Sequence, residues 1–274
     1  SWNWQCLSFI GVNDKFWSGI HYQSLVVNCF SRIRFNINIV FVQLIGQNAW
    51  KSFQPSTEKM INTRYEIIKK LGEGRSSVYL CRDLEFPEKE YAIKILPPVN
   101  NNQEREIFIK EFFTLQRLEH PAIIEAFEIG TVFHTDEENG IELGSTFITL
   151  EYFNGEELLA VKNNFNQKNI KEIVKQICAV LYYLHQSKYI YYDLKPENIL
   201  VSFKDENPRI KLIDLGLAEY SPSPSDYEIK GTAFYIAPEL LKKDTHNHSV
   251  DFYSLGMILY QIIYNRFPFD ARNE

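Results

Sequence analysis

The loop that carries Asp193, Lys195 and Asn198 constrains the fold of this chain more than any other stretch, because it sets polar groups between two short apolar runs. Those runs end at Ile190 and resume at Ile199, which predicts a loop held between short strands. An aspartate in such a loop can accept a proton from a hydroxyl, a lysine can neutralise a moving phosphate, and an amide oxygen suits Mg²⁺. The pattern indicates phosphoryl transfer, with an ordinary polar surface turn as the alternative.

Composition excludes several other classes of protein. A chain of 274 residues with 45% hydrophobic content can bury one large core or two modest ones. A net charge of −6 argues against a nucleic-acid-binding surface, which needs clustered Lys and Arg. The cysteines are too widely spaced for a zinc site or a disulfide framework, which indicates reduced thiols and a cytoplasmic protein. No apolar run reaches the about 18 residues that an ordinary membrane span needs.

Residues 1–59 differ in composition from the rest of the chain. They hold all 4 tryptophans and carry five Lys and Arg against two acidic residues, whereas the remainder is acidic. A strand-like alternation begins at Ile33, but the segment lacks the order of a signal peptide. Met60 leads directly into the first convincing strand. We therefore expect residues 1–59 to be a poorly ordered or non-native extension and the folded domain to occupy residues 60–274.

A glycine-rich hairpin is predicted at the start of that domain, with a turn at residues 72–77 between apolar strands. Glycines let the backbone approach a ligand and expose amides to phosphate oxygens, although an ordinary strand turn has the same composition. The next predicted strand, residues 91–96, carries Lys94 inside an apolar run, where a cation is costly unless it is paired.

Glu111 is the predicted partner of Lys94. Residues 103–118 have helical spacing, and Glu111 shares one side of that helix with Leu115 and Leu118. The other acidic residues of the helix are expected on its surface. Two further strands are predicted, at residues 123–130 and 146–152, with a turn at Asn139-Gly140 between them.

The second half of the domain is predicted to be mainly helical. Apolar residues at three- and four-residue spacing from Ile170 to Leu184 predict a buried helix face ahead of the polar loop. His185, at the end of that helix, is expected to have a structural role. His246 and His248 have no third ligand nearby, so we expect a solvent-exposed loop there rather than a metal site. A strand at residues 209–213 leads to Asp214-Leu215-Gly216.

Several motifs in one order resemble the eukaryotic-like (Hanks-type) protein kinase domain, and the match covers about residues 64–270. They are the glycine hairpin, Ala92-Ile93-Lys94, residues 150–153, residues 193–198, Asp214-Leu215-Gly216 and, most specific, the element at residues 231–239. The resemblance implies an α+β, two-lobed fold: an antiparallel sheet with one helix in an N-terminal lobe, residues 60–153, and a mainly helical C-terminal lobe, residues 154–274. The family's last helices are missing.

The resemblance also implies a binding site for ATP and Mg²⁺ between the lobes. Asp193 and Lys195 would be catalytic, and Asn198 and Asp214 would bind the metal. Backbone groups of Glu151 and Phe153 would bind adenine, and Glu157 could reach the ribose. The implied nucleotide-binding residues are Leu71, Gly72, Glu73, Gly74, Ser77, Val78, Ala92, Lys94, Glu111, Glu151, Phe153, Glu157 and Leu200.

Some positions depart from the family pattern. Tyr192 stands where most members have the arginine that binds a phosphate on the activation segment, which predicts activity without that phosphorylation. Tyr191 replaces a histidine and Leu215 a phenylalanine, and both are expected to fill the same apolar positions. Thr232 is expected to orient Asp193 and Lys195. Asp251 matches the buried helix acid that holds the loop backbone.

The resulting interpretation is an ATP-dependent serine/threonine protein kinase that acts in signalling, with protein substrates and no nucleic-acid partner. Glu239 lacks the partner that the family's last helices supply, so we expect a fragment of a longer protein, nearest to bacterial multidomain kinases, with further domains after residue 274. Two alternatives remain. One is a pseudokinase or scaffold that binds partners without transferring phosphate, and the other is a small-molecule phosphotransferase of the aminoglycoside type.

Overall fold

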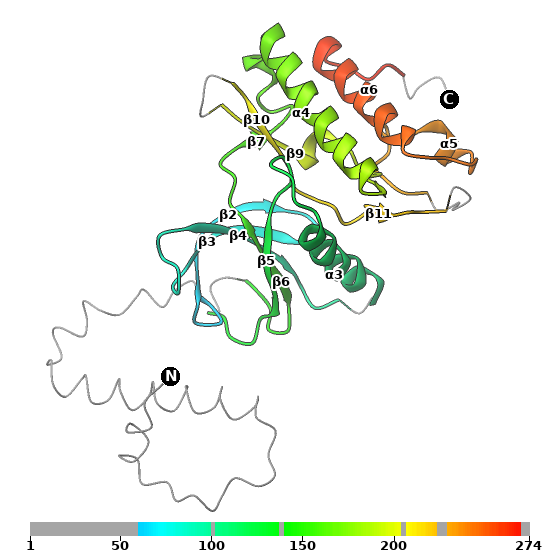
Figure 1. The fold of residues 1–274 in the computed structure, drawn as a ribbon. Coiled ribbons are helices and arrows are strands. Elements are labelled where there is room, and N and C mark those ends of the chain that lie inside the picture. Colours follow the sequence, from blue (N-terminus) through cyan, green and yellow to red (C-terminus); the bar gives the residue numbers. More distant parts are fainter. Residues whose placement is uncertain (1–59, 100–101, 137–139, 204–206, 224–228, 270–274) are drawn as a thin grey trace, which may run out of the picture. The chain divides into compact units, whose positions relative to one another are not determined.

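The computed structural model describes residues 60–99, 102–136, 140–203, 207–223 and 229–269. The expectations for residues 1–59 and for the turn residue Asn139 lie outside these ranges. Within them, the chain forms the two-lobed α+β arrangement that the sequence predicts (Figure 1).

A six-stranded antiparallel sheet forms the N-terminal lobe, in the order β1-β2-β3-β4-β6-β5. The strands are β1 (Met60–Ile61), β2 (Tyr65–Glu73), β3 (Ser77–Asp83), β4 (Glu90–Leu96), β5 (Ala126–Thr131) and β6 (Thr146–Glu151), and the helix α3 (Asn102–Arg117) packs beside β5. Side chains alternate across a strand, so β4 sends Ile93 and Ile95 into one apolar core and Ala92 and Lys94 to the opposite face. That opposite face carries the candidate site.

Residues 60–64 join the two ends of this sheet, a feature that the sequence did not indicate. β1 pairs with β2, while Ile61 also forms a bridge with Thr135, beyond the end of β5. The Asn62 amide donates to the His134 carbonyl at 2.8 Å. These contacts connect the beginning of β2 to the chain that follows β5, and residues from distant parts of the sequence therefore enclose one apolar core.

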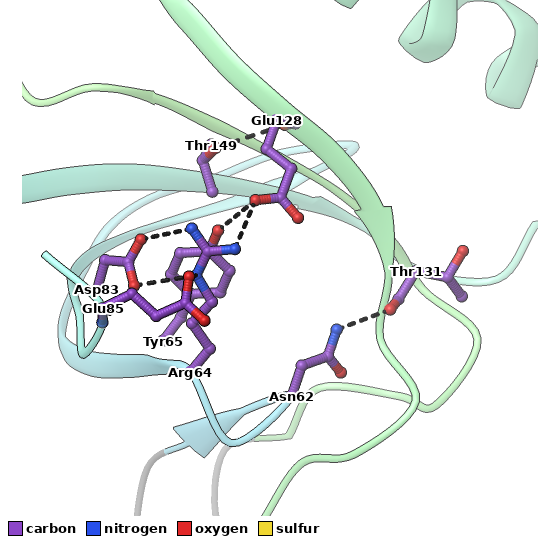
Figure 2. Close-up of polar contacts among 8 residues, drawn as sticks. All are labelled: Asn62, Arg64, Tyr65, Asp83, Glu85, Glu128, Thr131 and Thr149. Carbon is purple, nitrogen blue, oxygen red and sulfur yellow. Dashed lines mark hydrogen bonds and ion pairs between the residues drawn. The ribbon is translucent and has the colours of Figure 1, made fainter. Parts of the chain in front are cut away.

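Arg64 reinforces that connection (Figure 2). Its guanidinium donates to Asp83 at the end of β3, at 3.0 Å from Nε and 2.7 Å from Nη2, and to Glu128 on β5 at 3.0 Å. The Tyr65 hydroxyl donates to the same Glu128 carboxylate at 2.7 Å. Burial alone would raise the pKa of Asp83, but the hydrogen bonds from Arg64 and from the Glu85 amide lower it.

The C-terminal lobe is built on α4 (Gln167–Gln186) and α6 (Ser249–Tyr264), with the short helix α5 (Pro238–Leu241). Asn166 caps α4 by accepting a hydrogen bond from the Asn169 amide at 2.9 Å. The helix buries Ile173, Ile177, Leu181 and Leu184, the face that the apolar spacing predicted. The remaining elements are the strands β7 (Glu156–Glu157), β8 (Tyr189–Ile190), β9 (Ile199–Ser202), β10 (Arg209–Leu212) and β11 (Glu219–Tyr220), and the 3₁₀ turns η5 (Lys162–Asn164) and η6 (Pro196–Asn198).

Two small sheets, in the orders β10-β9-β7 and β11-β8, hold the loop singled out in the sequence. β8 precedes that loop and β9 follows it, as predicted. The predicted strand at residues 123–130 begins only at Ala126, which corrects the sequence expectation. Its first residues pair with β10 instead, because the Ile124 amide donates to Leu212 at 2.9 Å and the Leu212 amide donates to Ala122 at 2.8 Å.

In the part of the chain that the structure covers, no helix combines the length and apolar character needed to cross a bilayer.

Candidate active site

Lys94 joins three segments of the chain. Its ammonium lies 2.6 and 2.7 Å from the two carboxylate oxygens of Glu111 on α3, and 3.4 Å from Asp214, which follows β10. Lys94 is only 9% exposed and Glu111 only 3%. The predicted pairing of Lys94 with Glu111 is therefore present, and it links α3 to the sheet.

Burial and charge act in opposite directions on this pair. Full burial raises the pKa of Glu111 to about 7, helped by the charge of Asp214 and opposed by the attraction of Lys94. For Lys94, burial lowers the pKa, but the charges of Glu111 and Asp214 outweigh burial and raise it. Lys94 therefore stays cationic at neutral pH, and it offers Asp214 a positive neighbour.

The polar loop forms a second cluster around Asp193. Asn198 donates from Nδ2 to the backbone carbonyl of Asp193 at 2.8 Å and to its Oδ2 at 3.0 Å. Lys195 lies 2.9 Å from that same oxygen. Thr232 donates to Oδ1 at 2.7 Å and accepts from Lys195 at 2.9 Å, as the sequence predicted. The carboxylate is thus oriented from both sides, while its remaining lone pairs can still accept a hydroxyl.

Asp251 of α6, which is completely buried, holds the backbone of the loop that carries Asp193. Asp251 accepts from the amides of Tyr191 and Tyr192 at 3.0 and 2.9 Å, and its Oδ2 lies 2.8 Å from His185 Nε2. These bonds satisfy the buried acid and secure the left-handed backbone of Tyr192, at φ 64°. The structural role predicted for His185 and the buried position predicted for Tyr191 are both confirmed.

Gly231 brings the following segment against this loop. Its φ of 113° suits glycine, and a Cβ there would lie 2.7 Å from the Tyr192 carbonyl oxygen. A larger residue would push the two segments apart. The close approach delivers Thr232 to Asp193.

The two clusters meet through the backbone. The Ile213 amide donates to the Asn198 carbonyl at 3.1 Å, so Asp214 follows directly after a residue bonded to the polar loop. The Gly216 amide donates to Asp214 Oδ1 at 2.9 Å and limits rotation of that carboxylate. Side chains from β4, α3, the polar loop and the segments after β10 and β11 therefore gather in one region.

The sheet register decides which predicted nucleotide-binding residues share a face. Val78 lies opposite Lys94, and Ala92 lies opposite Leu150, so these side chains point to the face that carries the Lys94 ammonium. Leu200 of β9 lies opposite Glu157 of β7. Phe153 packs against the apolar core that contains Ala92 and Leu150. The Glu151 carboxylate instead accepts a hydrogen bond from Lys211 at 2.6 Å.

The glycine hairpin has the predicted form. The Gly74 amide donates to the Ser76 carbonyl at 3.1 Å, which closes the turn between β2 and β3. A Cβ on Gly72 or Gly74 would meet nothing within 4 Å, so open space lies beside both backbones. Leu71, Glu73 and Ser77 complete the hairpin.

The residues present fit a nucleotide with Mg²⁺. The Asp214 side chain is 41% exposed, and the amide of Asn198 is fixed by its two donated bonds. A carboxylate and an amide oxygen are hard ligands, and Mg²⁺ typically takes only one or two protein groups and completes its shell with phosphates and water. Because a Cβ on either glycine would meet nothing within 4 Å, a ligand can approach both backbones closely.

The expectation that His246 lies in a solvent-exposed loop is wrong. Its ring is buried, with Nε2 2.9 Å from the Tyr192 hydroxyl and the two ring centres 5.7 Å apart. The tyrosine that replaces the family's arginine supplies both the hydroxyl and the apolar surface that hold it. His248 is exposed, as expected. Among the residues covered by the structure, no group of three or more His, Cys, Asp and Glu could hold a metal.

Comparison with known proteins places these features in a family. A family model described as "Protein kinase domain" matches residues 65–274. The chain is 34% identical over 215 residues to the probable myosin light chain kinase of Dictyostelium discoideum, covering 77% of this chain and 42% of that protein. It is 30% identical over 224 residues to the serine/threonine-protein kinase PrkC of Bacillus subtilis, covering 78% of this chain and 32% of that one. The chain spans less than half the length of both relatives.

Proposed function

The chain belongs to the protein kinase domain family, and on that premise we propose that it transfers the γ-phosphate of ATP to serine or threonine hydroxyls of proteins. The observation that carries the proposal is the geometry of the charged side chains. Lys94 lies within 3.4 Å of Asp214, and Asp193 holds Lys195 and Thr232 at hydrogen-bonding distance. The similarity to serine/threonine-protein kinases such as PrkC favours serine and threonine as acceptors.

Each residue has a role in this proposal. Lys94, held by Glu111, positions the α- and β-phosphates of ATP. Asp214 and Asn198 would hold Mg²⁺, which when bound neutralises charge on the phosphates. Val78 and Ala92 provide an apolar surface for adenine on the face of the sheet that also carries Lys94.

Asp193 and Lys195 act on the reacting atoms. Asp193 accepts the proton of the substrate hydroxyl while the hydroxyl oxygen forms a bond to the γ-phosphorus. The bond from that phosphorus to the bridging oxygen breaks, and ADP leaves with the electron pair. Lys195 balances charge on the transferring group, and Thr232 keeps both side chains aligned. Most of the rate enhancement would come from positioning and electrostatics.

Transfer to protein hydroxyls would make this domain a signalling enzyme. Cys81 and Cys178 are both free thiols, which supports a reducing, cytoplasmic location.

The test is to incubate the purified protein with radiolabelled ATP and Mg²⁺, a generic basic protein and a panel of aminoglycosides. We expect label on serine and threonine of the protein substrate, and its loss in Asp193→Asn. Label confined to aminoglycosides would instead indicate a small-molecule phosphotransferase. Nucleotide binding without any transfer would indicate a pseudokinase or scaffold.

A further inference from the structure

Glu219 lies between two lysines that belong to different parts of the site. Its Oε1 is 3.6 Å from the Lys110 ammonium and its Oε2 is 2.9 Å from the Lys230 ammonium. The backbone of Glu219 is itself fixed, because β11 pairs with β8 and sets Glu219 opposite Ile190. One carboxylate therefore connects α3, the strand before the polar loop and the segment after β11.

Lys110 connects Glu219 to α3, the helix that carries Glu111. It precedes Glu111 on α3, and Glu111 holds Lys94 through both of its oxygens. A displacement of α3 at Lys110 would also displace Glu111. Lys110 is 45% exposed, so its contact with Glu219 orients the helix without completing a buried core.

Lys230 connects Glu219 to the loop that carries Asp193, because it also contacts the Tyr192 ring. It is buried, with 8% exposure, and its ammonium lies 5.6 Å from the centre of the Tyr192 ring. A buried cation is costly without a nearby anion, and the structure gives it Glu219. Lys230 is followed by Gly231 and Thr232, which contact Tyr192 and Asp193.

We propose that Glu219 is a positioning residue that aligns the Lys94–Glu111 pair with Asp193. The inference rests on the proposed function, since the alignment matters for phosphoryl transfer. Lys110, Glu219 and Lys230 supply opposite charges within the chain itself, at the contact between α3 and the segment ending in Thr232. This alignment uses charges of the chain itself, and a misplacement of about 1 Å far from the reacting atoms can lower activity by about 100-fold.

The experiment compares Glu219→Gln with Glu66→Gln. Glu66 is a matched control, because it also forms an ion pair, at 3.2 Å with Arg82, and its side chain is 28% exposed against 24% for Glu219. We expect kcat/KM to fall by about 10- to 100-fold in Glu219→Gln and to change by less than about twofold in Glu66→Gln. Glu219→Asp keeps the charge and should recover part of the loss.

Variants of Lys110 and Lys230 distinguish an effect on ATP binding from an effect on the transfer step. Lys110→Gln loosens α3 and should mainly raise KM for ATP, whereas Lys230→Gln loosens the segment at Thr232 and should mainly lower kcat. The double variant Glu219→Gln, Lys230→Gln should lose little more kcat than the worse single variant, because the two side chains act through one contact. A merely structural role would lower melting temperature without this division between KM and kcat.

Kinetic constants of Glu219→Gln equal to those of Glu66→Gln would overturn the inference. If Glu219→Gln does not fold, Lys110→Gln decides, because this exposed lysine can be replaced without removing the contact between Glu219 and Lys230. An unchanged KM for ATP would then refute the α3 contact. A wild-type protein that transfers no phosphate refutes the proposed function alone. Amide exchange in residues 102–117 then tests the positioning role, which requires faster exchange in Glu219→Gln than in Glu66→Gln.

Discussion

At the scale of single residues, the candidate site depends on charges that would be costly if they stood alone. Lys94 is buried among apolar side chains and is stable there because Glu111 and Asp214 surround it. Asp251 is buried more completely still, and two backbone amides and His185 satisfy it. Both groups therefore hold distant segments together at the place where polar chemistry is needed.

Replacing Lys94 tests the nucleotide side of the site. We expect Lys94→Met to lower kcat/KM by about 100-fold or more, equivalent to several kcal/mol of transition-state stabilisation, because the phosphates lose their cation. Lys89→Met is the control, an exposed lysine just before the same strand, and should leave the kinetics unchanged. Steady-state phosphate transfer at varied ATP measures both, and near-normal activity of Lys94→Met would contradict the role given to it.

Variants of Thr232 and of the serines in the same segment distinguish a role in hydrogen bonding from a role in phosphorylation. Thr232→Val removes the bonds to Asp193 and Lys195 and should lower kcat by about 10- to 100-fold. The triple replacement of Ser221, Ser223 and Ser225 by alanine should leave activity largely intact, because Tyr192 cannot bind a phosphate as an arginine does. Complete inactivation of the triple variant would show that the segment needs phosphorylation after all.

At the scale of elements, residues 60–64 show how a short segment can organise a whole sheet. β1 has only 2 residues, yet it pairs with β2 and with the chain beyond β5. Arg64 then links β3 to β5 through Asp83 and Glu128 (Figure 2). The connection draws together residues up to 76 positions apart, as in the bond from the Met60 amide to Asp136.

Removing Arg64 should destabilise the N-terminal lobe. Asp83 is 3% exposed and would be left with a buried charge, so we expect Arg64→Met to lower the free energy of unfolding by about 1–3 kcal/mol near neutral pH. Arg82→Met, which removes an ion pair with the partly exposed Glu66, should cost less than about 1 kcal/mol. Chemical denaturation measures both values.

The pH dependence of that loss follows from Asp83. Its pKa in the folded protein is lowered from the ordinary value of 3.8, so its contribution is fully present above pH 3.8 and disappears as the pH falls through the lower, folded value. The difference in unfolding free energy between Arg64→Met and the wild type should therefore shrink in that acid range. A difference that stays constant there would exclude the Arg64–Asp83 pair as its source.

At the scale of the whole molecule, one apolar core continues from α3 through β9 and β10 to α4 and α6. Ile123 and Leu212 pair across it, and this pairing joins the chain between α3 and β5 to the C-terminal lobe. The elements that carry Glu111 and Asp214 are thus parts of one packed unit, and their distance is set by the core rather than by the charges alone.

Deleting residues 1–59 tests whether that unit is sufficient for stability and activity. Met60 already belongs to the N-terminal lobe, because its amide donates to Asp136 and its side chain is buried. We predict that a protein starting at Met60 keeps both the melting temperature and the phosphotransfer activity of the longer chain. Thermal denaturation and the transfer assay decide, and a large loss of either would assign residues 1–59 a structural or regulatory part.

The sequence determined the elements and chemistry that depend on local pattern. Alternation and helical spacing predicted the strands around Lys94 and the helices α3 and α4, because burial imposes a period on apolar residues. The chemical types and spacing of Asp193, Lys195 and Asn198 indicated phosphoryl transfer, since one short loop holds all three. The pairing of Lys94 with Glu111 was also accessible, because a lysine in an apolar strand requires an anion nearby.

Only the tertiary structure decided which exposed-looking residues meet. Glu219, Lys110 and Lys230 follow no periodic pattern, and His246 resembled any loop histidine until the fold set it against Tyr192. The same is true of residues 60–64, whose partners lie at Asp83, Glu128 and Thr135. Such contacts depend on how strands and helices pack over long sequence distances, and packing leaves no local signal in a single sequence.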